Sequence, residues 1–375
     1  DGHRSLIALM DRVRRAEPTL AVDLPGFPAA TKVKRVEFIE FATSAEEAPA
    51  LEALLAATGF APTGKHISKP VTLWRQGGAN VLVNTDNTGF ARTSFVAHGT
   101  TVSEVALLVS DAKATHDRAL ALLAQDHAST AKPGELAIPA IRGVGGSILR
   151  LLDSGSDLAR IWSVDFHAEA ASGPAALSGA GLTGIDHLGQ TMAYDEMLSW
   201  ALFYTSIFDA RKAPMVDVAD PDGLVRSQAV QAGGLRVTLN GAEARRTLAG
   251  RFVEETFGAA VQHVAFASED IFGTAAKLAE TGFPVLRIGA NYYDDVEARF
   301  GLDPALVARM RAANVLYDED AGGQFFQLYS APRADGFFFE IVQRQGNYVG
   351  YGAPNAPFRI AAQKRHARPA GMPHY

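Results

Sequence analysis

The sequence contains no cysteine among its 375 residues. This absence excludes disulfide frameworks, thiolate nucleophiles and zinc or iron–sulfur sites held by cysteine. Any metal ion bound by the chain must therefore be held by histidine, aspartate or glutamate. Long apolar runs are missing too, because charged residues and glycines interrupt them before they reach the ~20 residues of a membrane-spanning helix. We therefore expect no membrane association.

An excess of positive charge is also absent. The chain has 35 Lys and Arg residues against 41 Asp and Glu residues, which gives a net charge of -6. Without a basic field, a nucleic-acid partner is not expected. No signal peptide with a basic start and an apolar middle is visible, so we expect a cytoplasmic protein. The length is sufficient for two or three domains.

A pattern recurs four times from residue 33 onward. Each copy begins with an alternating or apolar strand, continues into an alanine-rich helix and ends with further strands. The copies begin as VKRVEFIEFATSAEEAPALEALLAATGF, VSEVALLVSDAKATHDRALALLAQ, GIDHLGQTMAYDEMLSWALFYTSIFD and VQHVAFASEDIFGTAAKLAETGF. The later strands are visible as VTLWRQ and ANVLVN, SILRLLD and ARIWSVDF, RSQAV and LRVTLN, and GQFFQLYS and FFFEIVQR. The sequence therefore predicts an α+β fold of four β-α-β-β-β modules.

Consecutive modules are expected to pair into two domains, each a curled mixed sheet around a cavity with helices outside. The predicted domains cover residues 33–170 and 180–366, and a segment rich in Gly, Ser and Ala connects them. Residues 1–32 are predicted to form a short helix and a Pro-rich linker, and residues 367–375 a tail. A cavity inside a paired sheet is where we expect a ligand to bind.

Two histidines occupy the same position in consecutive modules. The first strands of the four modules carry, in turn, Glu37, Glu104, His187 and His263. Because duplicated modules pack about a pseudo-twofold axis, equivalent strand positions can converge on one point. A third candidate ligand, Glu340, interrupts the apolar run FFFEIV, where a buried carboxylate needs a partner such as a metal ion.

Two imidazoles and one carboxylate on one side of a metal ion leave open coordination positions opposite, as in non-heme Fe(II) oxygenases. A keto acid can then chelate the iron through two oxygens while dioxygen takes the last position. Ligand types alone do not identify the metal, so Mg²⁺, Mn²⁺ and Co²⁺ remain alternatives to Fe(II). A lone strand histidine is more often a packed residue than a ligand, and the repeat equivalence is what favours a metal site here. The first two modules lack these histidines, so we expect them to be structural.

Four segments carry a resemblance to a known family: VQHVAFASEDI, NYYDDVEAR, VLYDEDAGGQFFQLYSAP and FFFEIVQRQGNYVGYGAPN. Here the sequence resembles the 4-hydroxyphenylpyruvate dioxygenase family of the vicinal-oxygen-chelate fold. The resemblance implies that His187, His263 and Glu340 hold Fe(II) and are the catalytic residues. It also implies a group of residues around the substrate: Gln262, Gln327, Ser227, Asn240, Tyr351, Asn355 and Phe358.

The resemblance further implies that a small aryl α-keto acid is the substrate and dioxygen the co-substrate. The keto acid would lose CO₂ and its ring would be hydroxylated. The sequence departs from the family at three places. Leu248 stands where the family has a substrate-facing glutamine, Ala356 stands where it has an aromatic residue, and its Asn-Glu-Pro turn reads Asn240-Gly241-Ala242. These changes predict weaker recognition of a phenol group.

The N-terminal segment RSLIALMDRVRRAEP, which precedes a Pro-rich stretch, resembles the junction in certain bacterial fused enzymes. In those enzymes a sugar-phosphate-isomerase-like barrel with 3-dehydroshikimate dehydratase activity precedes a dioxygenase-like half. Since the chain also begins with Asp1 rather than Met, we expect an upstream dehydratase barrel as its fusion partner. The chain would then have a binding or assembly role, or act on an unknown substrate. A lyase or isomerase that uses Mg²⁺, Mn²⁺ or Co²⁺ is a further alternative, and a homo-oligomer is expected.

Overall fold

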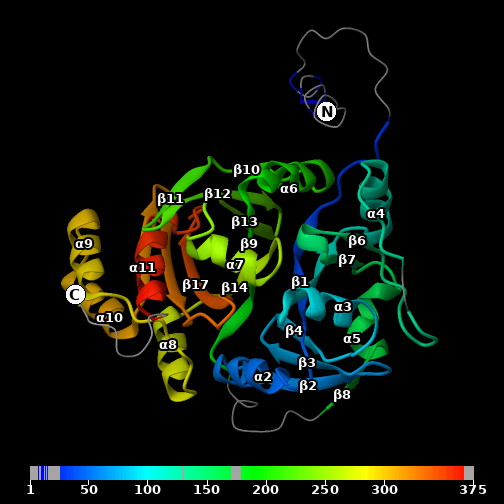
Figure 1. Cartoon of the computed structure of the whole chain (residues 1–375), viewed down its shortest axis with the longest axis horizontal. Coiled ribbons are helices and arrows are strands. Elements are labelled where there is room, and N and C mark those ends of the chain that lie inside the picture. The colour runs from blue at the N-terminus through cyan, green and yellow to red at the C-terminus, as the bar shows by residue number, and fades with distance from the viewer. Residues whose placement is uncertain are drawn as a thin grey trace.

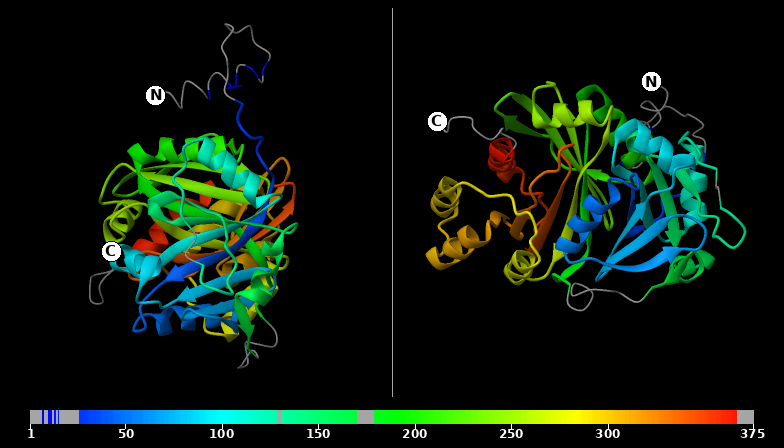
Figure 2. Two further views of the ribbon diagram at one scale, coloured as in Figure 1. Left: turned by 90° about the vertical axis from the view of Figure 1, so that its right-hand side faces the viewer. Right: turned by 60° about the horizontal axis from the view of Figure 1, so that its bottom comes forward.

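The structure is a computed structural model that describes residues 26–128, 131–169 and 179–366, together with residues 7, 10, 11, 13 and 15. Two curled sheets lie side by side (Figures 1 and 2). Most of the helix and linker expected before residue 33, most of the segment expected between the two domains, and the expected tail lie outside the described residues. The exact domain boundaries stay a prediction.

The first sheet consists of strands β1 to β8, which are β1 (Val33–Ala42), β2 (Ala61–His66), β3 (Val71–Gln76), β4 (Ala79–Asn84), β5 (Thr101–Val109), β6 (Ala140–Arg142), β7 (Ile148–Asp153) and β8 (Phe166–Ala168). Their order is β6-β7-β5-β1-β4-β3-β2-β8. The central pair β1 and β5 is antiparallel, whereas β1 runs parallel to β4 and β5 runs parallel to β7. Two modules are therefore joined through their first strands.

The second sheet consists of strands β9 to β17, which are β9 (Leu182–Ala193), β10 (Arg211–Lys212), β11 (Val216–Asp220), β12 (Gly223–Ala232), β13 (Leu235–Ala242), β14 (Ala260–Ser268), β15 (Leu316–Asp320), β16 (Gly323–Tyr329) and β17 (Phe338–Gly346). Their order is β10-β12-β13-β9-β14-β17-β16-β15, with β11 added to β12. The central pair β9 and β14 is antiparallel, and each runs parallel to the last strand of its own module. The second sheet thus repeats the plan of the first.

The helices pack around these sheets. They are α2 (Ala48–Ala57), α3 (Gly89–His98), α4 (Ala112–Ala121), α5 (Ile161–Val164), α6 (Tyr194–Ile207), α7 (Leu248–Glu255), α8 (Ile271–Glu280), α9 (Ala290–Phe300), α10 (Pro304–Ala313) and α11 (Ala356–His366). Aspartates cap the helices that follow the first strands of two modules: Asp111 accepts a hydrogen bond from the amide of Ala114 and Asp270 from that of Gly273. In the described part of the chain, none of the helices combines the length and the apolar character that crossing a membrane requires.

One predicted strand is wrong. The segment ARIWSVDF forms the end of a 3₁₀ turn and the short helix α5, and only its last residue begins β8. Ser156 favours this outcome because its side chain accepts a hydrogen bond from the amide of Leu158 and so begins a helical turn. The other later strand predicted for this module, SILRLLD, is present as β7, and Asp126 makes an isolated bridge with Ile141 ahead of it.

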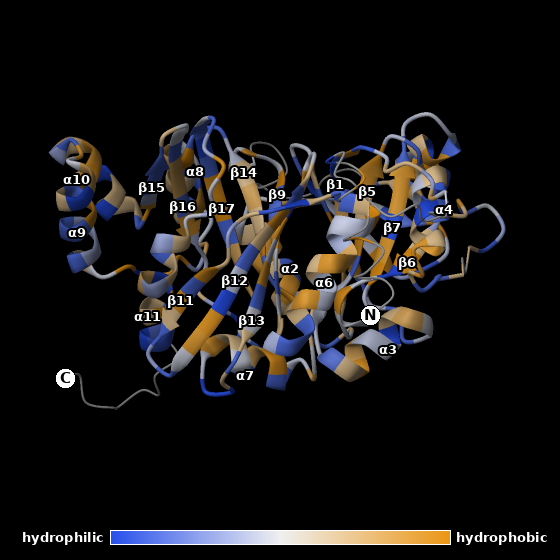
Figure 3. Ribbon diagram, turned by 90° about the horizontal axis from the view of Figure 1, so that it is seen from above, coloured by the Kyte–Doolittle hydropathy of each residue, from blue (hydrophilic) through white to orange (hydrophobic). Residues whose placement is uncertain are grey.

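The two sheets share one hydrophobic core. Phe41 of β1 packs edge-on against Phe337, with ring centroids 5.4 Å apart, and Phe60 lies 5.1 Å from Phe266. Figure 3 shows hydrophobic residues along β5, β6 and β7 of the first sheet. One face of each sheet faces this shared core and the opposite face lines a cavity of its own. The packed core therefore fixes the strands from which the cavity residues project.

Candidate metal centre

Strands β9 and β14 bring His187 and His263 together. In the antiparallel register, His187 lies opposite Ala265 and His263 lies opposite Gly189. The two imidazole centroids are 5.4 Å apart. Only glycine fits at position 189, since an added Cβ would lie 1.8 Å from Cε1 of His263. The missing side chain therefore makes room for the His263 ring.

Glu340 completes the cluster from the neighbouring strand. Strand β17 runs parallel to β14 and places Glu340 beside Ala265. Its Oε2 lies 3.4 Å from Nε2 of His187 and 3.7 Å from Nε2 of His263. One ligand atom from each of the three residues lies within 4.8 Å of the others, and all three side chains are buried. The three candidate ligands thus meet at one point of the fold.

A buried aspartate and a half-buried arginine orient this cluster. Nδ1 of His187 lies 2.8 Å from Oδ1 of Asp186, and the guanidinium of Arg344 donates two hydrogen bonds of 2.9 Å to Asp186. Burial alone would raise the pKa of Asp186, but the hydrogen bonds from His187 and Arg344 hold it well below its usual range. Because Asp186 engages Nδ1, Nε2 of His187 is left to face the cluster. Sequence reasoning missed Asp186, whose only signal is its place directly before His187.

Gln327 and Asn355 support Glu340 from behind. Nε2 of Gln327 donates a 2.8 Å hydrogen bond to Oε1 of Glu340, and Nδ2 of Asn355 donates a 2.7 Å hydrogen bond to Oε1 of Gln327. Phe358 packs edge-on against Tyr292, with centroids 4.9 Å apart. The family resemblance places Gln327, Asn355 and Phe358 around the substrate. In the structure they lie behind the residues that line the cavity and do not line it themselves.

The charges inside the cluster are coupled. Burial favours neutral His187, but the negative charge of Glu340 and the hydrogen bond with Asp186 outweigh it and raise the pKa of His187 to about 9. Burial dominates at His263 and lowers its pKa to about 3. Burial opposes ionisation of Glu340, yet the positive His187 outweighs it and lowers the pKa of Glu340. The metal-free cluster therefore holds a proton on His187, which a metal ion must displace.

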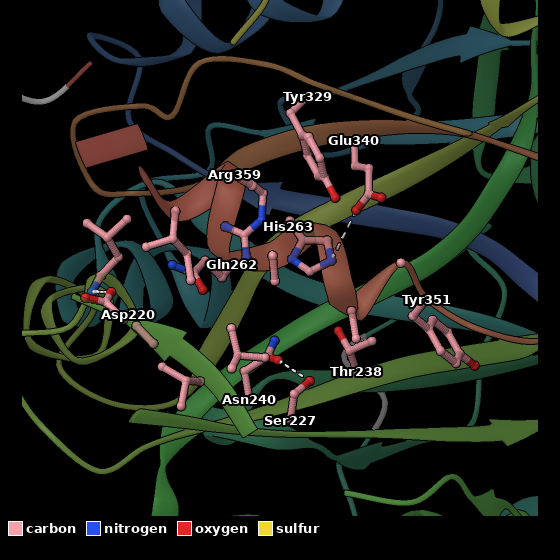
Figure 4. Close-up of a pocket in the computed structure, with 18 of the residues that line it drawn as sticks. Asp220, Ser227, Thr238, Asn240, Gln262, His263, Tyr329, Glu340, Tyr351 and Arg359 are labelled. Carbon is pink, nitrogen blue, oxygen red and sulfur yellow. Dashed lines mark hydrogen bonds and ion pairs between the residues drawn. The ribbon is translucent and has the colours of Figure 1, made fainter. Parts of the chain in front are cut away.

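The cluster faces a cavity that helix α11 helps to close (Figure 4). Among the expected substrate residues, four line this cavity: Ser227, Asn240, Gln262 and Tyr351. Leu248 and Ala356, where the sequence departs from the family, line it as well. Thr238, Tyr329 and Arg359 also line it, and sequence reasoning missed all three because nothing in their neighbouring residues marks them.

Two hydroxyl groups in the cavity have no hydrogen-bond partner in the described part of the chain: Oγ1 of Thr238 and Oη of Tyr351. Gly189 and Ala265 are equivalent positions, because each lies opposite one of the two histidines. Thr238 pairs with Gly189 and Glu340 pairs with Ala265, so Thr238 is the pseudo-twofold counterpart of Glu340. A threonine here in place of a second carboxylate limits the strong protein ligands to three. Buried hydroxyls without partners are costly. A polar ligand beside the cluster would satisfy them, and this donor set fits a divalent ion with open positions.

The first sheet carries an ion pair where the second carries the cluster. Its strand registers place Phe38 opposite Ala106, Glu104 opposite Glu40, and Arg150 beside Ala106. The counterparts of His187, His263 and Glu340 are therefore Phe38, Glu104 and Arg150. The sequence pattern predicts Glu37 at the position equivalent to His187, but the structure places the next residue, Phe38, there. A bulge between Val36 and Phe38 shifts the register of β1 by one residue. Arg150 donates two hydrogen bonds to Glu104, so a salt bridge stands where the second sheet has its candidate metal ligands.

Comparison with known proteins agrees with this geometry. Residues 27–167 match the family described as "Hydroxyphenylpyruvate dioxygenase, HPPD, N-terminal", and residues 184–307 match the "Glyoxalase/Bleomycin resistance protein/Dioxygenase superfamily". The chain is 32% identical to a 4-hydroxyphenylpyruvate dioxygenase of Pseudomonas aeruginosa, over 85% of this chain and 90% of that protein. The chain belongs to the 4-hydroxyphenylpyruvate dioxygenase family. The predicted α+β fold of this family is confirmed.

Other relatives of this dioxygenase-family chain are longer. It is 39% identical to a protein of Pseudomonas aeruginosa named 3-dehydroshikimate dehydratase, over 98% of this chain but 59% of that protein. A solved structure, titled "xylose isomerase-like TIM barrel/4-hydroxyphenylpyruvate dioxygenase fusion protein", matches with a TM-score of 0.81 and 36% identity, over 95% of this chain and 56% of the solved chain. The chain thus spans little more than half the length of these relatives.

Proposed function

We propose that this chain is the dioxygenase-like part of a bifunctional 3-dehydroshikimate dehydratase, and that its cavity binds a divalent metal ion together with a small α-keto acid. The buried cluster of His187, His263 and Glu340, which opens on a cavity, carries this proposal. The length and name of the dehydratase relatives support the fusion.

In this proposal, His187, His263 and Glu340 hold the metal ion through two nitrogens and one oxygen. Fe(II) is the favoured ion, and when bound it supplies the redox chemistry of dioxygen with the keto acid; Mn²⁺, Co²⁺ and Mg²⁺ are alternatives. Asp186 keeps the His187 ring in one orientation, and Gln327 does the same for the Glu340 carboxylate. The protein thereby keeps three ligands in place before any substrate arrives.

Other residues of the cavity act on the organic ligand. The hydroxyls of Thr238 and Tyr351, which lack partners in the described chain, donate to the oxygens of a ligand seated beside the cluster. Ala356 and Ile360 of α11 cover it with apolar surface and exclude water. A ligand held this way is oriented by its polar end at the cluster and by its body against α11.

Anaerobic titration tests the proposal. Fe(II) and an α-keto acid, added together to the protein, should give a visible absorption band that His187→Ala abolishes. His116→Ala is the matched control, since His116 lies outside the cavity and pairs with Asp126. Metal analysis of protein purified without added metal identifies the ion. Absence of both a band and stoichiometric metal binding in the wild-type protein would contradict the proposal.

A second candidate is the full activity of the family, oxidative decarboxylation of an aryl α-keto acid. The identity to a 4-hydroxyphenylpyruvate dioxygenase along 90% of its length and the complete ligand cluster favour it. Oxygen uptake with 4-hydroxyphenylpyruvate tests it directly. A role limited to assembly predicts instead that Glu340→Gln leaves the dehydratase turnover and oligomeric state of the fused protein unchanged. A homo-oligomer stays a prediction.

A further inference from the structure

Arg359 projects from α11 into the same cavity as the candidate metal ligands, and Figure 4 shows it beside His263 and Gln262. Its guanidinium carbon lies 5.0 Å from the ring centroid of Phe338 and 5.8 Å from that of Tyr329. Phe338 in turn stacks on His263, with centroids 5.0 Å apart and planes 17° from parallel. The cation is therefore held by aromatic surface against the wall that carries His263.

The charge of Arg359 has no counter-charge in the described part of the chain. Its Nη1 donates a 2.7 Å hydrogen bond to the neutral amide of Gln363, and no carboxylate oxygen lies within 4.0 Å. By contrast, Arg344 is paired with Asp186, the residue that engages His187. A guanidinium in a cavity is a strong donor to carboxylates, and its fork matches their two oxygens. Arg359 is therefore free to bind an anionic ligand.

The remaining charges of the cavity leave room for an anion. Asp220, the one other acidic residue of the lining besides Glu340, is neutralised by its ion pair with Lys364. A divalent ion brings two positive charges and Arg359 a third, whereas Glu340 offsets only one of them. A keto acid with a single carboxylate leaves one positive charge uncompensated, and a ligand with two carboxylates balances the site.

Two amides of the cavity lining add further donors. Oδ1 of Asn240 accepts a 2.8 Å hydrogen bond from Ser227, and Oε1 of Gln262 accepts a 2.7 Å hydrogen bond from Thr191. Because their oxygens are engaged within the protein, each amide offers its NH₂ group to a ligand. Together with Arg359 they form a set of N–H donors suited to carboxylate oxygens.

We infer that the cavity selects an α-keto acid that carries a second carboxylate, and that Arg359 is the residue that recognises this second group. This inference rests on the proposed function, because it assumes that the keto acid end binds at the metal. Apolar residues of the lining, among them Leu248 and Ile360, then contact the part of the ligand between its two charged ends.

Calorimetric binding to anaerobic Fe(II)-loaded protein tests the inference. The probes are two pairs that differ in the second carboxylate: 2-oxoglutarate against 2-oxopentanoate, and 4-carboxyphenylpyruvate against phenylpyruvate. In at least one pair, the diacid should bind about tenfold more tightly, as expected for a hydrogen-bonded charge pair. Arg359→Met should remove this preference while leaving the monoacid affinity within about twofold. Arg359→Lys should retain part of it, because the charge remains.

Arg309→Met is the matched control, since Arg309 also lies over an aromatic ring, that of Phe272, but outside the cavity. It should leave both affinities unchanged. Equal affinities for diacid and monoacid in the wild-type protein overturn the inference, as does an equal loss of both in Arg359→Met. If no keto acid binds more tightly to the Fe(II)-loaded than to the metal-free protein, the proposed function itself fails.

Discussion

Gly189 determines how closely the two histidines approach each other. Any side chain at this position of β9 would occupy the space of the His263 ring, since an added Cβ lies within 2.1 Å of both Cε1 and Nδ1. On the other side of β14, His263 pairs with Phe338 of β17, whose ring stacks on the imidazole at a centroid distance of 5.0 Å, so the His263 ring is enclosed from both neighbouring strands. The position of a candidate ligand therefore depends on a residue without a side chain.

We expect Gly189→Ala to displace His263 and to reduce metal binding by at least about tenfold, the usual cost of misplacing a group that orients a metal ligand. Gly184→Ala is the control, because Gly184 lies in the same strand and an added Cβ there meets nothing within 4 Å. Metal stoichiometry after dialysis against a weak chelator measures both. Equal metal content in the two variants contradicts this role.

At the scale of single residues, the sequence was sufficient for part of the candidate site. His187, His263 and Glu340 could be predicted because two of them recur at one repeat position and the third is a carboxylate in an apolar strand. Thr238 and Arg359 could not, since their importance depends on the strand register and on how α11 lies over the sheet. Such positions are set by tertiary packing, which leaves no local pattern.

Strands β1 and β5 bring two buried carboxyl groups together. Glu40 and Glu104 lie directly opposite each other, and both are buried. Like charges in this arrangement repel. Burial, followed by the charge of Glu104, raises the pKa of Glu40 to about 8, although a hydrogen bond from Asn84 opposes the shift. Glu40 is therefore largely protonated in the folded protein at neutral pH.

A glutamate whose pKa is raised on folding binds more protons in the folded than in the unfolded state. The free energy of unfolding then falls as the pH rises from the unfolded value near 4.5 to about 8. We expect Glu40→Gln to remove part of this decline and to be the more stable protein at pH 8.5 by about 2 kcal/mol or more.

Urea denaturation between pH 5 and 8.5 provides the measurement. Glu46→Gln is the control because Glu46 is exposed. Parallel pH profiles of the wild-type protein and Glu40→Gln would show that Glu40 ionises alike in the folded and unfolded states.

The order of strands and helices could be predicted from the sequence, but the segment that departs from the repeated order could not. Each module alternates period-2 and period-3.6 segments, which fixes strand and helix independently of the surroundings. The helical segment around Trp162 fails this rule, because Nε1 of Trp162 donates a 3.0 Å hydrogen bond to Glu37 and the ring packs on Phe38. A contact between distant residues decides its conformation.

A buried arginine adds a polar link between the two halves, beside the apolar core that they share. Arg118 of α4 donates hydrogen bonds of 2.9 and 2.6 Å to the carbonyl groups of Ile207 and Ser206, at the C-terminal end of α6 in the second half. Carbonyl groups at a helix C-terminus favour a cation. Arg118 is only 4% exposed, so its removal leaves buried carbonyl groups without these donors.

We expect Arg118→Met to lower the free energy of unfolding by about 3 kcal/mol, since hydrogen bonds from a charged donor are lost in a buried site. Chemical denaturation followed by intrinsic fluorescence measures the change. Arg92→Met, an exposed arginine of α3, should change it by less than about 0.5 kcal/mol. If both variants unfold like the wild-type protein, the contact between α4 and α6 does not couple the halves.

The salt bridge between Glu104 and Arg150 has a consequence for how the two halves diverged. Since the strand registers of the two sheets coincide, one copy of a duplicated module pair could lose the candidate ligand cluster by changing side chains alone, without moving the backbone. The opposite change needs few substitutions as well. Phe38→His, Glu40→Gly, Glu104→His and Arg150→Glu would give the first sheet the same side chains that form the cluster in the second. The first half is therefore a scaffold in which four substitutions would create a second candidate metal centre.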